Sequence, residues 1–208
     1  MAKKQLENIF LSASIPLPER DEKYQANCDV IAIRDAVIAL VTTILPHYRL
    51  IWGGHPSITP LIYHVMQKME INIQEHLTLY QSDFFSQFYP EDNNKFKNVI
   101  ITPRGADRDS SLEIMRQRMI AGNQYRAGIF IGGMEGVEDE HNMFLKNHAA
   151  SLVLPIASTG AAAKIIYERN SYAPDTRLLE DYAYASLFRD YLLNDNSNNY
   201  GEEGIYQL

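Results

Sequence analysis

The sequence predicts a Rossmann-like α/β fold, with a mostly parallel sheet and helices on both faces. Short continuous apolar runs alternate with stretches in which apolar residues recur at helical spacing. Continuous apolar runs are typical of strands that are covered on both faces, as in a parallel sheet. Small residues, several of them glycine, follow four of these runs. This succession of strand, turn and helix is that of repeated βαβ units.

The first part of the chain carries two strand and helix units. Residues 8–14 are an apolar run that ends in small residues, as a buried strand does before a loop. A helix is expected over residues 30–44, where Asp29 can cap the first turn. A second strand is predicted over residues 48–54, where it ends in a glycine pair, and a helix over 57–69.

The same alternation continues to the end of the folded part. Further strands are expected over residues 77–80, 98–103, 127–131 and 151–156. Further helices are expected over residues 110–121 and 138–147, from residue 158 onward, and over 175–193. No linker divides the chain, so residues 1–193 are predicted to form one domain. Residues 194–208 are polar and are expected to form a mobile tail.

Composition narrows the class of protein. The chain has 208 residues, which is long enough to form a core without a metal or a disulfide. Its 46% of apolar and 22% of charged residues are close to the average of globular proteins. The net charge of −7 argues against nucleic acid as a partner. We find no signal sequence and no apolar run of the roughly 18 residues that a membrane helix needs. We therefore expect a cytoplasmic protein with no membrane partner.

The small-residue turns predict a ligand site. Ser12 and Ser14, the pair Gly53 and Gly54, the pair Gly132 and Gly133, and Thr159 follow predicted strands. In a parallel sheet such turns share the carboxyl edge, where ligands bind. Backbone N–H groups and helix N-termini at that edge favour phosphate. Neither glycine pair fits G-x-G-x-x-G or the Walker P-loop, so ordinary dehydrogenases and kinases are excluded.

The most specific motif is Gly132-Gly133-Met134-Glu135-Gly136-Val137, followed by Glu140 and preceded, sixteen positions before Gly132, by Arg116. It resembles the SLOG superfamily, which contains the LOG cytokinin-activating phosphoribohydrolases and the DprA/Smf proteins. LOG enzymes carry P-G-G-x-G-T-x-x-E with an arginine at a similar distance upstream. The resemblance extends over roughly residues 7–168 and supports the Rossmann-like fold.

The small-residue turns and the resemblance together imply a set of ligand-binding residues. They are Ser12, Ser14, Gly53, Gly54, His55, Arg116, Gly132, Gly133, Glu135, Gly136, Val137, Glu140 and Thr159. The motif departs from that of the enzymes by one inserted residue between Gly133 and Gly136, and by Ile131 in place of proline. In both respects it is more similar to the ligand-sensing SLOG branches found with TIR and Sir2 domains and in prokaryotic conflict systems.

Two functions follow from this resemblance. The first is a sensor that binds a nucleotide-derived signal, of the ADP-ribose or cyclic-nucleotide type, in a prokaryotic defence system. The second is a phosphoribohydrolase or NAD-derivative hydrolase that cleaves an N-glycosidic bond. In that case Glu140, with help from Glu138, would stabilise the oxocarbenium-like ribose and Arg116 would hold the phosphate. A nucleic-acid module like DprA is a third hypothesis, which the acidic balance disfavours.

Partners and cofactors are predicted from the remaining residues. The sensor hypothesis requires an effector protein or a homo-oligomer to receive the signal, and tyrosines near the C-terminal helix suit packing or a dimer surface. The six histidines are spread over different elements, so neither a metal nor a cofactor is expected. The aromatic segment 84–89 fits a satellite core, a subunit contact or a stack against a base.

Overall fold

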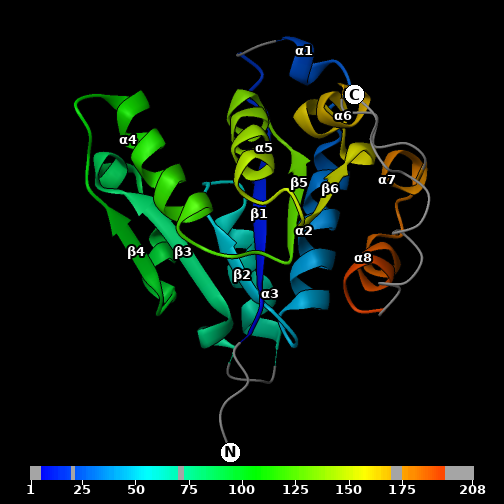
Figure 1. Cartoon of the computed structure of the whole chain (residues 1–208), viewed down its shortest axis with the longest axis horizontal. Helices are drawn as coiled ribbons and strands as arrows, with labels where there is room; N and C mark the ends of the chain where they lie inside the picture. Colours follow the sequence, from blue (N-terminus) through cyan, green and yellow to red (C-terminus); the bar gives the residue numbers. More distant parts are fainter. Residues whose placement is uncertain (1–5, 20–21, 70–72, 170–174, 195–208) are drawn as a thin grey trace, which may run out of the picture.

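A computed structural model describes residues 6–19, 22–69, 73–169 and 175–194 of the chain. Six strands form one sheet in the order β4-β3-β2-β1-β5-β6, and each pairing of neighbours is parallel. The predicted Rossmann-like α/β fold is thus confirmed (Figure 1). The strands are β1 (Asn8–Ser14), β2 (Arg49–Trp52), β3 (Leu77–Ser82), β4 (Val99–Thr102), β5 (Ala127–Gly132) and β6 (Leu152–Ile156).

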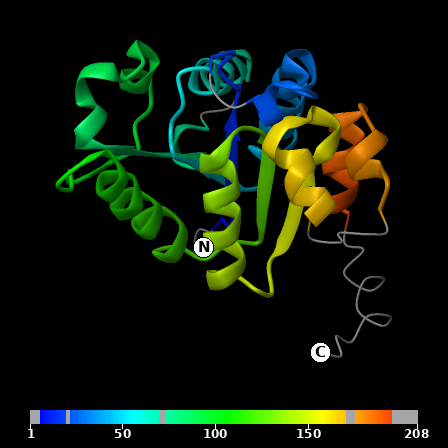
Figure 2. The same ribbon diagram turned by 90° about the horizontal axis from the view of Figure 1, so that it is seen from above.

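Helices cover both faces of the sheet. Figure 2 separates α4 and α5, on one side, from α2 and α3 on the other. The α-helices are α1 (Glu22–Gln25), α2 (Val30–Ile44), α3 (Thr59–Lys68), α4 (Arg108–Arg116), α5 (Glu135–Asn147), α6 (Ala161–Arg169), α7 (Arg177–Glu180) and α8 (Tyr184–Leu192). Short 3₁₀ or π turns are η1 (Gln74–His76), η2 (Asp83–Phe88), η3 (Glu91–Lys95), η4 (Gln117–Ala121) and η5 (Ala157–Thr159).

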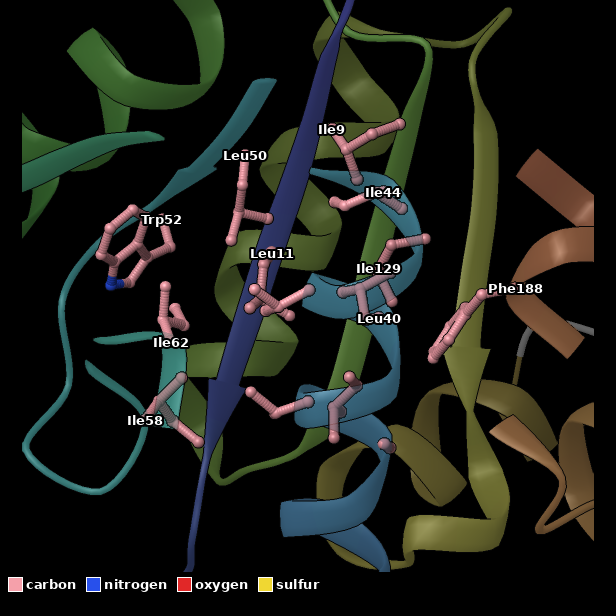
Figure 3. Close-up of a cluster of buried hydrophobic side chains, with 14 of the residues drawn as sticks. Ile9, Leu11, Leu40, Ile44, Leu50, Trp52, Ile58, Ile62, Ile129 and Phe188 are labelled. Carbon is pink, nitrogen blue, oxygen red and sulfur yellow. The ribbon is translucent and has the colours of Figure 1, made fainter. Parts of the chain in front are cut away.

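The core consists of two layers, because successive strand residues point to opposite faces of the sheet. In β1, Ile9 and Leu11 belong to the layer that contains α2 and α3, shown in Figure 3 with Leu40 of α2. Phe10 points the other way and stacks on Phe144 of α5, with ring centroids 5.5 Å apart. Full burial of a side chain of this size contributes about 1.5 to 3 kcal/mol.

Local capping matches the sequence at the start of α2. The side chain of Asp29 accepts a hydrogen bond from the N–H of Ala32 at 2.9 Å, as the sequence predicted. At α5 the structure differs, because the helix begins at Glu135 and not at residue 138. Gly132 and Gly133 both have positive φ, so the chain leaves β5 and enters the helix within a few residues.

The C-terminal region corrects a second expectation. In place of one helix over 175–193 the structure has α7 and α8, separated by Asp181 in an extended conformation. The carbonyl of Asp181 accepts from Ser158 Oγ at 3.0 Å, and its side chain accepts from the N–H of Ala183 at 2.7 Å. These bonds replace those of a continuing helix. The predicted tail 194–208 lies, apart from Asn194, outside the described residues.

The strand order creates a reversal beside β1. The chain adds β2, β3 and β4 outward on one side of β1 and then places β5 and β6 on the other. Loops that follow β1 and β5 therefore diverge, which leaves a crevice at the carboxyl edge of the sheet. No helix within the described residues is long and apolar enough to cross a membrane.

Candidate functional site

A cavity of about 290 Å³ opens at the carboxyl edge of the sheet. Its walls are the ends of β1, β2 and β3, one face of α4, the first turn of α5, and residues of η2 and the turn after it. It therefore lies beside the reversal in strand order, where open α/β sheets bind ligands. Its volume is close to the roughly 300 Å³ at which small-molecule pockets begin.

Most of the residues that the sequence predicts for a ligand site lie around this cavity. They are Ser12, Ser14, Gly53, Gly54, His55, Arg116, Glu135, Gly136, Val137 and Glu140. Gly132, Gly133 and Thr159 are not among the lining residues. The fold thus brings the turns after β1 and β2 to the start of α5, as the parallel arrangement predicts.

The glycine pair lies behind the cavity wall and joins the ends of the strands. The N–H of Gly133 donates to the carbonyl of Ser14 at 2.8 Å, and that of Gly132 donates to Oγ1 of Thr159 at 2.9 Å. Oγ1 of Thr159 in turn donates to the carbonyl of Ile156. These N–H groups, which the sequence led us to expect at an anion, are therefore used within the protein. They hold the ends of β1, β5 and β6 together.

Three elements meet at Glu140. The hydroxyl of Ser12, on β1, donates to Glu140 Oε2 at 2.6 Å, and Nε of Arg116, on α4, donates to Oε1 at 3.4 Å. The Arg116 and Glu140 side chains are 13% and 15% exposed. Each oxygen of the carboxylate thus has a donor, and Glu140 is among the residues that line the cavity.

The pKa of Glu140 is raised above that of an ordinary glutamate because burial disfavours the charged form. The positive charge of Arg116 and the hydrogen bond from Ser12 act in the opposite direction but do not cancel burial. Glu140 therefore keeps a proton to higher pH than a surface carboxyl does. Such a group suits either a fixed hydrogen-bonding role or acid-base chemistry.

Arg116 is held along the start of α5 by further contacts. Its Nη1 lies 3.2 Å from Asp139 Oδ2, and its Nη2 donates to the carbonyl of Gly136 at 3.4 Å. A Cβ atom on Gly136 would lie 3.0 Å from Nη2, so the absent side chain leaves room for the guanidinium. Arg118, by contrast, is exposed on the outer face of the same segment.

His55 presents a neutral ring to the cavity. Burial lowers its pKa to about 4, so it carries no charge at pH 7. The backbone N–H of Ser57 donates to its Nδ1 at 3.2 Å, and the Ser57 hydroxyl lies 2.7 Å from the same nitrogen. A nitrogen that accepts from a backbone N–H carries no proton, so the proton of the neutral ring resides on Nε2.

Glu138, suggested by the sequence as a helper of Glu140, is not a lining residue. It accepts from the hydroxyl of Tyr24 on α1 and pairs with Arg169 of α6, and Lys23 Nζ lies 3.5 Å away. Burial raises its pKa, but the Tyr24 hydrogen bond and the two cations outweigh burial and lower it overall. Glu138 therefore fastens α1, α5 and α6 together.

Some lining residues escaped the sequence analysis. Arg108, at the start of α4, lines both this cavity and an adjoining groove between α4 and α5. Gln81 lines the cavity from the end of β3. The strand was predicted to end at Tyr80, and glutamine is not one of the small residues by which the other turns at the carboxyl edge were identified.

The aromatic segment lies at the cavity mouth. Phe85, Phe88 and Tyr89 are lining residues, and η2 contributes no buried residue. A satellite core, one of three roles considered from the sequence, is therefore wrong. The hydroxyl of Tyr89 donates to the carbonyl of Ser82 at 2.7 Å, which fixes this ring against β3.

The histidines do not assemble a metal centre in the part of the chain that the structure describes, where no cluster of metal-ligating side chains occurs. His141 is buried against the ring of Phe130, with centroids 5.0 Å apart. His148 bonds through Nε2 to the carbonyl of Ile120 at 2.8 Å. These two histidines therefore pack within the core and not at the cavity.

Comparison with known proteins agrees with this architecture. The model of the SLOG cluster3 family matches residues 23–192. Among solved structures, the X-ray structure of TM1055, a structural genomics target, superposes with a TM-score of 0.52 and 13% identity. The superposition covers 83% of this chain and 89% of the TM1055 chain. At this sequence identity the likeness concerns the fold alone. No curated protein matches the sequence.

Proposed function

The chain belongs to the SLOG cluster3 family, and from this premise we propose that its cavity binds a nucleotide-derived small molecule. The proposed ligand is a signal of the ADP-ribose or cyclic-nucleotide type. The observation that carries the proposal is the contact of Ser12, Glu140 and Arg116 at the cavity wall, where three separate elements fix one carboxylate.

The polar groups suit the two hydrophilic parts of a nucleotide. Arg108 is exposed and Arg116 is partly buried, and both line the cavity beside the first turn of α5, which has no side-chain cap. Guanidinium groups and an uncapped helix N-terminus both favour phosphate. Glu140 and Ser12 supply oxygens that match ribose hydroxyls.

The arrangement favours recognition over turnover. Both oxygens of Glu140 already accept hydrogen bonds from the protein, which fix the carboxylate in place and make it a weaker base toward water. We therefore place the protein among sensors, which report their ligand to an effector protein or to further copies of the same chain. A cytoplasmic role in a prokaryotic defence system is the biological setting we propose.

Calorimetric titration tests ligand binding. The panel contains ADP-ribose, cyclic ADP-ribose, cyclic nucleotides, NAD and AMP, each added to the folded chain. We expect at least one to bind, and Arg116→Met to weaken that binding on the order of tenfold, because a charge-assisted phosphate contact is lost. Arg118→Met removes the same charge from the exposed face and should leave binding unchanged. A folded protein that binds no compound of this panel would refute the proposal.

Hydrolysis of an N-glycosidic bond is the second candidate, and the raised pKa of Glu140 favours it. The test is release of free base from AMP or NAD by the purified chain. Release that Glu140→Gln abolishes, with the fold retained, would establish hydrolase activity. Binding without release would assign the site to sensing.

A further inference from the structure

The two ends of the cavity differ in chemistry. The end at β1, α4 and α5 carries Glu140 and Arg116, whereas the end at β2, β3 and η2 carries neutral groups, including Gln81 and Phe85. β1 and β3 are separated by β2, which puts their ends about 10 Å apart. That distance is comparable to the length of a nucleoside monophosphate. A ligand held by phosphate and ribose at one end therefore extends its base toward the other.

Gln81 stands out among the neutral groups. It is only 5% exposed, and its side-chain amide makes no hydrogen bond to any residue that the structure describes. Its backbone carbonyl, by contrast, accepts from Thr102 Oγ1 at 3.3 Å. The amide is not one of the fully buried side-chain groups that lack a partner, so it has access to the cavity that Gln81 lines. A ligand in the cavity that Gln81 lines would supply the missing partners.

The neighbouring turn is shaped to accept this amide. A Cβ atom on Gly54 would lie 1.8 Å from Nε2 of Gln81, and Gly54 has a φ of +64°. Any other residue at this position would therefore collide with the amide and be strained in its backbone. The second glycine of the turn after β2 thus provides the space in which the Gln81 amide reaches the cavity.

Flat and neutral groups line the same cavity as the amide. Phe85 lines the cavity and is braced by Phe84, with ring centroids 5.0 Å apart and an interplanar angle of 77°. His55 adds an uncharged ring whose proton resides on Nε2, since Nδ1 accepts from Ser57. Proteins recognise nucleobases with this combination of a donor and acceptor pair at the edge and an aromatic surface against the ring.

We propose that Gln81, Phe85 and His55 form a nucleobase subsite, in which the Gln81 amide pairs with the hydrogen-bonding edge of adenine. This inference rests on the proposed function, since it names the base of the ligand in the same cavity. The amide oxygen accepts from the exocyclic amine, and the amide nitrogen donates to the adjacent ring nitrogen. The paired geometry is that by which glutamine and asparagine read adenine.

Three probes separate the base from the rest of the ligand. AMP carries the full edge, purine riboside 5′-monophosphate lacks the exocyclic amine, and ribose 5-phosphate lacks the base. We expect the wild-type chain to bind AMP on the order of tenfold tighter than purine riboside 5′-monophosphate, and ribose 5-phosphate more weakly than either. Gln81→Met, which keeps the side-chain volume, should lower AMP affinity on the order of tenfold and leave ribose 5-phosphate affinity unchanged.

The control is Gln87→Met, the same substitution at an exposed position of η2 outside the cavity lining, which should change none of the affinities. Equal binding of AMP and ribose 5-phosphate by the wild-type chain would overturn the nucleobase subsite while leaving the proposed function intact. So would equal losses for the two ligands in Gln81→Met. Tighter binding of GMP than of AMP would overturn the assignment to adenine. If neither these monophosphates nor any compound of the calorimetric panel binds, the proposed function itself is refuted.

Discussion

The side-chain nitrogen of Gln81 lies 1.8 Å from the point that a Cβ atom on Gly54 would occupy. Gln81 lies at the end of β3, and Gly54 lies in the turn after β2. The two strands are parallel neighbours in the sheet, which brings these residues together. Gly54 therefore serves the cavity by leaving space for a side chain, and not only by letting its own backbone approach a ligand.

Replacement of Gln81 should separate stability from binding. Gln81→Met removes an amide that reaches the cavity and has no hydrogen-bond partner among the described residues, so we expect the free energy of unfolding of the unliganded chain to stay within about 1 kcal/mol of the wild type. Urea denaturation of Gln81→Met, compared with the wild type and with the Gln87→Met control, measures the change. A clear loss of stability in Gln81→Met would show that the amide is satisfied in the unliganded protein.

The glycines of the motif should respond differently to alanine. In Gly133 the φ is +89° and a Cβ would lie 2.2 Å from Val137 Cγ2, so Gly133→Ala should destabilise the fold by roughly 2 to 3 kcal/mol. Gly136 is helical, and alanine there should improve helix propensity by up to about 1 kcal/mol while it displaces Arg116.

Thermal unfolding and ligand titration of both variants test this contrast. Gly136→Ala is expected to keep its melting temperature and lose affinity. A Gly136→Ala variant that melts far below the wild type, or a Gly133→Ala variant of unchanged stability, would contradict the roles assigned to these glycines.

The Arg116 and Glu140 pair should be strongly coupled. Arg116→Met leaves the buried carboxylate without its cation and should cost about 3 kcal/mol at pH 8. Glu140→Gln should cost less, since Arg116 keeps Asp139 as a partner. The double variant should be more stable than the sum of the two single losses implies.

The loss in Arg116→Met should also depend on pH. Glu140 has a raised pKa in the folded state. The free-energy cost of its buried charge is therefore absent below the pKa of the unfolded chain and grows as the pH rises through the folded-state pKa. We therefore expect the free energy of unfolding of Arg116→Met to be closer to that of the wild type at pH 5 than at pH 8. Equal losses at both values would show that the carboxylate is not the cause.

His55 should give the protein a pH dependence of the opposite sign. Its folded pKa of about 4 lies below the unfolded value of 6.5, so the unfolded chain binds a proton that the folded chain does not. Stability from this group is complete above pH 6.5 and is lost as the pH falls toward 4.

The matched variant is His55→Asn, in which an amide oxygen can accept from Ser57 in place of Nδ1. Between pH 6.5 and pH 4 we expect the wild type to lose on the order of 2 kcal/mol more of its free energy of unfolding than this variant. Urea denaturation at several pH values measures the difference. Parallel pH profiles for the two proteins would show that His55 is protonated in the folded state.

Much of the site was accessible from the sequence because parallel strands place their carboxyl ends at one edge. That rule alone brought Ser12, the turn at Gly53 and the start of α5 to a common cavity. It did not find Gln81 or Arg108, because nothing in their local sequence shows that the space opposite them is empty. It also gave the pair Gly132 and Gly133 a ligand-facing role, whereas the bonds to Ser14 and Thr159 depend on neighbours far along the chain.

Apolar patterns and propensities within a few residues were enough to predict most of the succession of strands and helices, the cap at Asp29 and a mostly parallel sheet. Which side chains meet depended on the packing of elements that are far apart in the chain. Ser12 and Glu140 are 128 positions apart, and the break at Asp181 depends on its contact with Ser158. Such contacts are set by how complete elements pack on one another, which no local pattern encodes.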